Sequence, residues 1–376
     1  MSYIILIAAF NAFFFTALLL QKKKALHDKI LIAWLIYLGV YTGAYALFSD
    51  SLFTDYHLLS AAFISLLLLH GPLMYFYVSA LADQSFKVDR NAQLHFIPFV
   101  LFNIYLLASL FLPETSNRIR LDHVETEEPV PVVFNIFLLM TVLSGPVYFV
   151  LAIGLFKKLH LNLVNNFSAT ESRNPEWLKK LVILFGTVWT ILIVAAALHH
   201  VFHFYTLQFC TDGLFLSLSA FIILVGYFGL RQKEIFIQYP DKAEAYVTEP
   251  EQKYAAPLLK ENEAEAYIGQ LRDLMKQEKP HLEANLTLPE LASRMDIPSH
   301  HLSRAINEKL GLNFFEFINR YRVEEVKAKL DDPAYENFSL LGIAFESGFN
   351  TKSAFNRVFK NLTGMTPGQY KKQIKV

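Results

Sequence analysis

Histidine is the residue type with the widest range of chemistry in the first 230 residues of this chain. His57, His199, His200 and His203 all lie near the predicted outer ends of apolar segments, with Asp212 close to the last three. His199 and His203 are four residues apart, so they share one face of a helix. Imidazoles at this spacing can bind a metal ion or pair with an anionic ligand. Helix contacts and polarity at a membrane interface explain the same pattern, so we assign no metal site.

Signatures of catalysis are absent from the sequence. It contains no Gly-rich phosphate loop, no paired-cysteine motif, no HExxH and no nucleophile elbow. Cys210 is the single cysteine, which excludes an internal disulfide. We therefore predict no catalytic residue, no bound cofactor and no enzymatic activity.

Long apolar segments must position the histidines. The chain is 53% apolar and only 18% charged, and the apolar excess lies before residue 231. Crossing the hydrocarbon core of a bilayer takes about 20 helical residues. Seven segments approach or exceed that length: 3–20, 30–48, 57–81, 94–112, 132–156, 181–202 and 211–230. The sequence predicts an all-α protein that begins with a bundle of seven transmembrane helices.

The distribution of basic residues predicts the orientation of this bundle. Alternate loops contain 13 Lys/Arg residues, whereas the opposite loops contain only Arg118 and Arg120. Basic loops stay in the cytoplasm, so we expect the N-terminus outside and the C-terminus inside. The first segment has no basic residues before it and no clear cleavage site, so we expect it to be retained. The prediction is a multi-pass protein of the bacterial inner membrane.

Two predicted spans contain a Gly-Pro pair, Gly71-Pro72 and Gly145-Pro146. Proline removes an amide hydrogen and crowds the preceding turn, so each pair is expected to kink its helix. The kink is either a hinge that responds to a ligand or a static packing feature. Polar residues deep in the spans either line a pocket or bridge helices: His70, Asn11, Asn103 and Asn135.

The polar part of the chain begins at Arg231. We predict a sensor domain over 1–230, a cytoplasmic linker over 231–262 that contains three prolines, and a second domain over 263–376. A helix over 263–279 carries apolar residues on one face and ends at Pro280. That face packs either on the domain that follows or on a second subunit.

A helix, a short turn and a second helix follow from Thr287. Thr287 and Glu290 form a capping box, in which each side chain accepts a hydrogen bond from the other residue's amide. Ala292 is small enough to let the next helix cross closely. Ser299 is the expected N-cap of that helix, over 300–310, and Gly311 is expected to end it.

A second pair of helices is predicted over 340–347 and 352–362, with Ala344 at the crossing position. Between the two pairs, Asn313 caps a helix over 314–330 that stops at Asp331-Asp332-Pro333. This helix is roughly 25 Å long. It can therefore hold two helices near one turn of DNA, which is about 34 Å.

These residues resemble the DNA-binding domain of the AraC/XylS family over about 264–372. The resemblance is carried by Gly348-Phe349, by residues 355–360, by residues 364–367 and by Tyr370. It implies two helix-turn-helix units joined by a helix, with the third and sixth helices in successive major grooves. Carried over by position, the base-facing residues are His300, Ser303, Arg304 and Asn307, then Lys352, Ser353, Asn356 and Arg357.

The side-chain chemistry agrees with these implied roles. Leu302 and Ile306 are expected to face inward, which turns the first four residues outward together. Arginine can contact guanine through two hydrogen bonds, and asparagine can contact adenine in the same way. Phosphate contacts suit four lysines: Lys309, Lys360, Lys371 and Lys372. Acidic neighbours reduce the basicity of the first unit, so the second is expected to contribute more of the electrostatic attraction.

The leading hypothesis is a membrane-embedded transcriptional regulator that couples an external or membrane signal to promoter binding. Its expected partners are double-stranded DNA, the lipid bilayer and an unknown small-molecule or membrane signal. A homodimer is allowed but not obligatory, because one chain carries two reading helices. Two alternatives are a transporter or intramembrane enzyme with a regulatory tail, and a stored transcription factor released by proteolysis in the linker.

Overall fold

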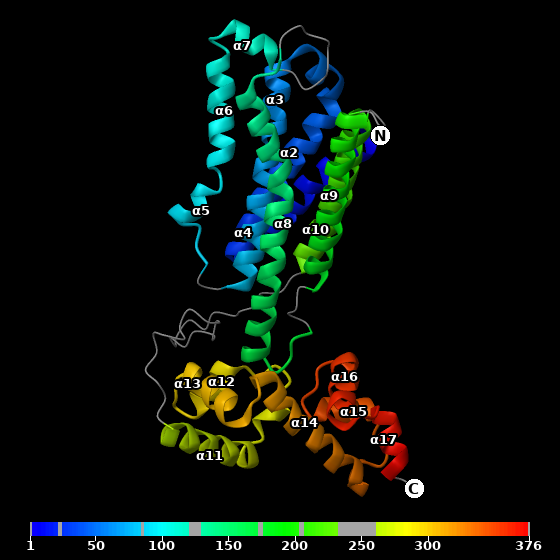
Figure 1. Ribbon diagram of the computed structural model, residues 1–376. Helices are drawn as coiled ribbons and strands as arrows, with labels where there is room; N and C mark the ends of the chain where they lie inside the picture. The colour runs from blue at the N-terminus through cyan, green and yellow to red at the C-terminus, as the bar shows by residue number, and fades with distance from the viewer. Residues whose placement is uncertain are drawn as a thin grey trace. The chain divides into compact units, whose positions relative to one another are not determined.

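Helices form every regular element that the structure describes. The computed structural model describes residues 2–21, 25–83, 86–119, 129–171, 176–202, 207–231 and 261–374 (Figure 1). These residues contain no strand, only one isolated antiparallel bridge between Phe167 and Thr287. The prediction of an all-α protein is therefore confirmed.

The helices group into two units. One contains Met1–Lys157 and Pro175–Gln232, and the other contains Lys158–Asn174 and Lys233–Val376. The second unit thus includes a segment that the sequence placed in the membrane half. Most of the predicted linker lies outside the described residues, so the predicted domain limits stay a prediction.

The first unit is built from apolar helices and two short polar ones, α5 and α7. Helix α1 packs against α2 and α10, α10 packs against α9, and α2 packs against α4. The bounds are α1 (Ser2–Leu20), α2 (Leu26–Asp55), α3 (His57–Ser65), α4 (Leu67–Ala82), α5 (Arg90–Leu94), α6 (Ile97–Ser109), α7 (Pro113–Arg118), α8 (Val132–Asn166), α9 (Glu176–Phe202) and α10 (Leu207–Arg231).

Five helical segments of the described residues are long and apolar enough to cross a membrane. They correspond to the first, second, third, fifth and seventh predicted spans: Ser2–Leu20, Leu26–Phe48, His57–Ala82, Val132–Asn166 and Thr211–Arg231. The sixth predicted span lies in α9, which has 27 residues. The predicted number of seven stays unconfirmed.

The fourth predicted span differs most from its prediction. Helix α5 ends at Leu94 and α6 begins at Ile97, so 94–112 is not one continuous helix. Pro98 lies in the first turn of α6. Proline has no amide hydrogen and fits the start of a helix better than its interior, which explains the restart. The apolar helix that remains has 13 residues.

The two Gly-Pro pairs have a packing role. A Cβ atom added at Gly71 would meet the ring of Tyr148, and one added at Gly145 would meet the ring of Trp189. Each glycine therefore lets an aromatic ring of another helix approach closely. Both prolines lie inside helices that continue past them. The hinge interpretation stays a prediction.

The deep polar side chains of the first unit differ in their partners. Trp34 Nε1 donates to His70 Nδ1 over 3.4 Å, and Asn103 donates to Ser65 Oγ over 2.9 Å, so these two residues bridge helices. Asn11 donates to a carbonyl of its own helix, and Asn135 is exposed.

The predicted outer histidine cluster is only partly described. His203 lies outside the described residues, as do the side chains of His199 and His200. Asp212 accepts a hydrogen bond from Tyr45 Oη over 2.7 Å. Within the described part of the chain, no group of three or more metal-ligating side chains is present.

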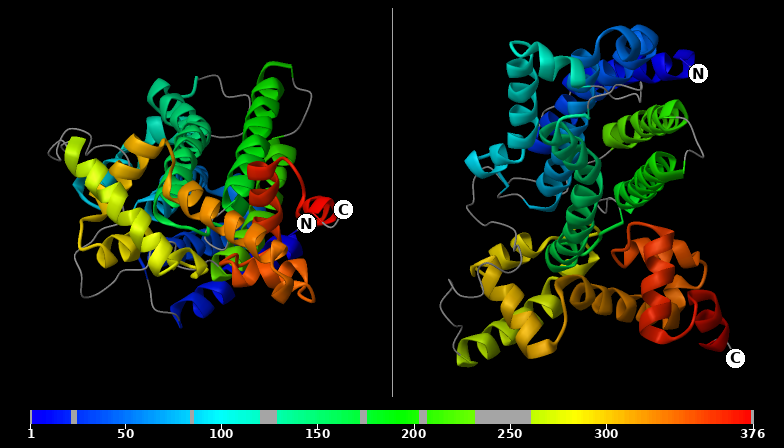
Figure 2. Two further views of the ribbon diagram at one scale, coloured as in Figure 1. Left: turned by 90° about the horizontal axis from the view of Figure 1, so that it is seen from below. Right: turned by 45° about the horizontal axis from the view of Figure 1, so that its top comes forward.

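The second unit is arranged around α14 (Phe314–Asp331), which has 18 residues; α11 has 17 residues and the helices from α12 to α17 other than α14 are shorter. The start of α14 packs into a core with the helices before it, and its end packs into a core with those after it. Figure 2 shows α14, in orange, between these two groups. The other bounds are α11 (Glu261–Gln277), η2 (Pro280–Leu282), α12 (Leu288–Arg294), α13 (Ser299–Ala305), η3 (Ile306–Leu310), η4 (Pro333–Tyr335), α15 (Leu340–Glu346), α16 (Lys352–Thr363) and α17 (Pro367–Ile374).

Local signals in this unit predicted the helix ends closely. The capping boxes at Thr287 and Asn313 are both present, and Gly311 ends η3 with a φ of 65°. The apolar face of α11 packs on α13, η3 and η2, as the first of the two predicted alternatives has it. The prediction for Ser299 was wrong: Pro298 is the N-cap, and Ser299 is the first helical residue with only 3% exposure.

Candidate nucleic-acid interface

Helix α16 presents the clearest polar face of the second unit. Ala354, Phe355, Val358 and Phe359 are buried, which fixes the rotation of the helix. The predicted contact residues all fall on its exposed side: Lys352, Ser353, Asn356, Arg357 and Lys360. Thr351 caps the helix by accepting from the Ala354 amide over 3.1 Å. The structure therefore brings all four predicted base-facing residues of this helix to one surface.

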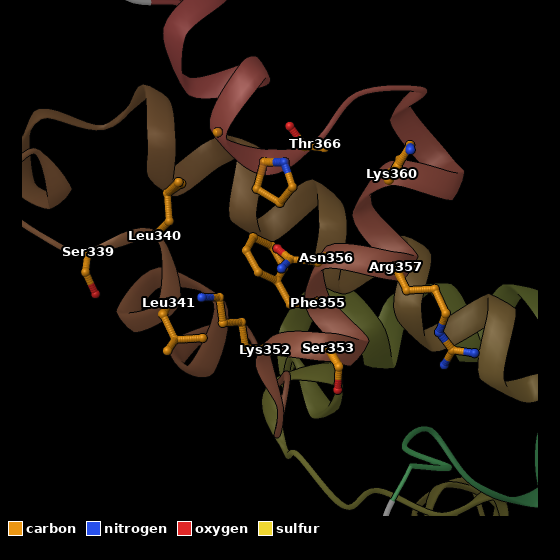
Figure 3. A pocket seen from close by; sticks show the side chains of 12 residues that line it. Ser339, Leu340, Leu341, Lys352, Ser353, Phe355, Asn356, Arg357, Lys360 and Thr366 are labelled. Atoms are coloured by element: carbon orange, nitrogen blue, oxygen red, sulfur yellow. The ribbon is translucent and has the colours of Figure 1, made fainter. Parts of the chain in front are cut away.

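This surface is hollowed where three helices meet. An open hollow of about 700 Å³ is lined by the ends of α15 and α17 and by the polar face of α16. Figure 3 shows Lys352 and Asn356 on the side of α15, with Arg357 extending away from them. The four predicted base-facing residues and Lys360 all line this hollow.

The first predicted recognition helix is α13 with η3. Leu302 and Ile306 are buried as predicted, while His300 and Asn307 are exposed. Ser303 does not join them, because it is 6% exposed and its hydroxyl lies 3.5 Å from Asn307 Nδ2. The Ser303 hydroxyl accepts a hydrogen bond from the side-chain amide of Asn307 and does not project outward. The helix also widens over η3, which has π-helical geometry.

Acidic side chains neutralise the cations of this first half. Arg304 Nε lies 2.7 Å from Glu308 Oε1, and Lys309 lies 3.3 Å from Glu265. Partial burial lowers the pKa of His300, and the charge of neighbouring His301 lowers it further. This pKa shift favours the neutral form of the His300 ring. The weak basicity predicted for this half is thus built from specific ion pairs.

Lysines at the end of the chain are more accessible. Lys360 and Lys372 are exposed, and Lys371 is half-buried beside Tyr370 at the end of α17. Exposed ammonium groups attract phosphates without strict geometry.

A buried arginine joins the two halves of the unit. Arg322 of α14 is 1% exposed, and its Nε donates to His281 O over 2.8 Å. One terminal nitrogen donates to Glu283 O over 2.8 Å. Its guanidinium carbon also lies 6.0 Å from the ring centre of Phe349, in the turn before α16. Burial lowers the pKa of Arg322 to about 10, while nearby Glu171 raises it.

Two further contacts of Arg322 come from the segment between α8 and α9. Its terminal nitrogens donate to Ser168 O and to Ser168 Oγ, each over 3.0 Å. Three residues later, Glu171 forms an ion pair with Arg357 over 2.5 Å. Arg357, one of the two arginines predicted to contact guanine, is therefore paired with an acidic side chain of the same unit.

The sequence analysis missed Arg322, Ser168 and Glu171. One signal for Arg322 was available, because it lies four residues after Ile318 and four before Val326, on the apolar stripe of its helix. A charge on such a stripe is rarely buried without partners. Nothing local marked Glu171, because its partner is 186 residues away.

Residues 291–373 match the family described as Helix-turn-helix domain. An uncharacterized HTH-type transcriptional regulator of Staphylococcus aureus strain COL is 35% identical over 91 residues, 24% of this chain and 12% of that protein. A regulator with the same description from Staphylococcus aureus strain MSSA476 has the same identity over the same number of residues. The transcriptional regulatory protein HptR of Staphylococcus aureus is 29% identical over 119 residues, 32% of this chain and 44% of HptR.

This chain thus spans less than half the length of these curated relatives, and no solved structure matches it. The matched family binds DNA and is not catalytic, which agrees with the prediction that the chain is no enzyme. The C-terminal part of the chain carries an AraC-type helix-turn-helix domain.

Proposed function

We propose that this protein is a membrane-embedded transcriptional regulator that binds promoter DNA through two helix-turn-helix units. The polar face of α16 carries the proposal, because five contact-forming side chains share it while the opposite face is wholly apolar. A helix of this kind places its exposed side chains against base edges in the major groove. The relatives' description as transcriptional regulators supports the same function.

Within α16, Arg357 contacts guanine through two hydrogen bonds and Asn356 contacts adenine. Lys352 and Ser353 supply further contacts near the start of the helix. The exposed lysines Lys360 and Lys372, with Lys371, bind phosphates and set the register of the protein on DNA.

Within α13 and η3, Arg304 and Asn307 face the bases of a neighbouring groove. Ser303 orients the Asn307 amide, and neutral His300 acts as a hydrogen-bonding group. Lys309 supplies a phosphate contact once Glu265 releases it. Because Glu308 and Glu265 hold these cations, this helix adds specificity more than electrostatic attraction.

The apolar helices anchor the regulator in the inner membrane, with the N-terminus outside and the DNA-binding unit in the cytoplasm. Five apolar helices support a membrane anchor. The bias of basic residues toward alternate loops supports this orientation for a chain in which all seven predicted spans cross the bilayer. A small-molecule or membrane signal acts by favouring one arrangement of the helices over another. A homodimer is compatible with this function and is not required for it.

Arg304→Ala and Arg357→Ala test the base contacts. The full chain is placed in lipid nanodiscs, and the probe is a duplex that the wild-type protein selects from a random-sequence pool. Each substitution should weaken binding by about 1–3 kcal/mol and relax specificity at a single position. Footprinting and competition binding measure both effects.

Arg272→Ala is the matched control, because Arg272 is exposed on α11, which packs on the buried side of α13. It should leave the affinity for the duplex unchanged. Unaltered protection by both recognition-helix variants would refute the assigned base contacts.

A further inference from the structure

Residues 162–171, which we name the docking segment, are built into the DNA-binding unit. The Ser168 amide donates to Leu286 O over 3.1 Å, and its hydroxyl donates to the same oxygen over 2.7 Å. Phe167 forms the antiparallel bridge with Thr287, the residue that caps α12. Asn166, Phe167 and Ser168 are each at most 1% exposed. Backbone pairing together with burial indicates a specific docked position.

Ser168 completes the surroundings of a buried cation. Besides the two hydrogen bonds from Arg322, its carbonyl accepts from Asn319 Nδ2 over 3.1 Å. A buried donor that loses its acceptor carries the full desolvation penalty. Undocking therefore forces Arg322 to find water or new partners. Since Arg322 also contacts the turn before α16, docking and the geometry between the two halves are coupled.

Glu171 at the end of the docking segment contacts Arg357, which the proposed function assigns to DNA. One oxygen of its carboxylate contacts one terminal nitrogen of the Arg357 guanidinium, a group that can instead bind a phosphate or a guanine edge. The Glu171 side chain is only 19% exposed, whereas that of Arg357 is 56% exposed. The acid is thus fixed while the arginine is accessible. It also places a negative charge at the surface that DNA must approach.

Helix α8 leads directly into the docking segment. It runs from Val132 to Asn166, so its last residues belong to the DNA-binding unit. Among the five candidate spans it is the least buried, at 17% against 33–50% for the others. Its contacts in the first unit include a 2.7 Å hydrogen bond between Tyr148 Oη and His95 Nδ1. A helix that the rest of the protein covers less loses fewer protein contacts when it moves.

We propose that the docking segment is an intramolecular brake on DNA binding. When docked, Glu171 holds Arg357 and Ser168 holds Arg322. A shift of α8 withdraws both residues together, which frees Arg357 and lets the two recognition helices readjust about α14. This regulation rests on the proposed function, because the brake acts on the same DNA-binding surface. The membrane signal then reaches DNA through α8, in addition to any route through the linker.

Glu171→Gln tests the brake, because it keeps the size of the side chain and removes its charge. The full chain in nanodiscs should bind the selected duplex about threefold to fivefold more tightly than the wild type. Glu324→Gln is the matched control, since Glu324 pairs with Lys327 on the exposed side of α14, away from the docking segment. It should leave the affinity unchanged. Equal affinity of Glu171→Gln and wild type would overturn the brake.

Hydrogen exchange tests docking independently of DNA affinity. The Ser168 amide should exchange slowly in the free protein and faster when the selected duplex is bound. Ser168→Ala should raise exchange over 166–171 without DNA. Rapid exchange of this amide in the free wild-type protein would overturn the docked position. If the wild type selects no duplex, the proposed function fails and the brake with it, while this exchange still decides whether the segment docks.

Discussion

Arg322 and His281 are ionisable side chains that are buried in the second unit. They differ in charge and in hydrogen bonding. Arg322 donates hydrogen bonds to backbone carbonyls and to the Ser168 hydroxyl. His281 is 3% exposed, and its Nδ1 has no hydrogen-bond partner among the described residues. Burial lowers the pKa of His281 to about 4, although the nearby Glu325 carboxylate raises it. His281 is therefore neutral at physiological pH.

The lowered pKa of His281 predicts a pH dependence of stability. The unfolded chain takes up a proton near the ordinary histidine pKa of 6.5, whereas the folded chain does so only near 4. The free energy of unfolding should therefore be flat above pH 6.5 and fall by about 2–3 kcal/mol as pH drops toward 4. Hydrogen exchange of α14 amides, corrected for the intrinsic effect of pH, measures this.

His281→Gln should abolish that slope. Burial raises the pKa of Glu325, but the hydrogen bond and charge of Lys279 with other nearby cations outweigh it and lower the pKa. The stability that Glu325 contributes is lost only below its ordinary value of 4.5, so it does not account for a change between pH 6.5 and 4.5. Identical slopes in wild type and variant would assign the effect to another group.

At the scale of elements, the turn between α15 and α16 determines how α16 packs on α14. Gly348 has a φ of 89°, which only glycine adopts without strain. A Cβ atom there would collide with His281 O and crowd Arg322 Nε. The turn thus needs glycine for its backbone angle and for its closeness to the buried arginine.

Gly348→Ala should lower the free energy of unfolding by more than about 2 kcal/mol, because backbone strain and the collision add. Gly364→Ala is the matched control: its φ is 77°, but no atom lies near the added Cβ. It should cost about 1 kcal/mol from backbone strain alone. Hydrogen exchange of α15 and α16 amides compares the two, and equal losses would show that the contact with His281 and Arg322 is unimportant.

At the scale of the whole molecule, α8 is the element that contributes residues to both units. The hydrogen bond between Tyr148 and His95 holds this helix in the first unit, and Ser168 and Glu171 hold the segment that follows it in the second. In the proposed mechanism, a change in the first unit reaches Arg357 through this helix and the docking segment. Coupling of this kind appears in experiment as non-additivity.

Tyr148→Phe and Glu171→Gln together test that coupling. Alone, Tyr148→Phe should raise the affinity for the selected duplex by up to about fivefold, because it loosens α8 and releases the docking segment. In the Glu171→Gln background, Tyr148→Phe should raise the affinity little further, since the ion pair between Glu171 and Arg357 is already lost. Tyr3→Phe, at a residue that is 82% exposed on α1, serves as the control. Fully additive gains would show that α8 does not act through Glu171.

The sequence by itself determined the features that depend on neighbouring residues. The capping boxes at Thr287 and Asn313, the glycine stop at Gly311 and the face of α16 follow from local hydrogen bonding and helical period. Long apolar runs likewise predicted the five helices that can span a bilayer. These signals are short-range, so a single sequence contains them completely.

Only the tertiary structure decided the features that join distant parts of the chain. It buried Ser303 and Ser299, because packing can cover a polar residue that the helical period turns outward. It paired Glu171 with Arg357 and gave Arg322 its acceptors from Ser168, 154 residues away. Such pairings depend on how elements distant in the sequence pack against one another, and no local sequence pattern specifies that packing.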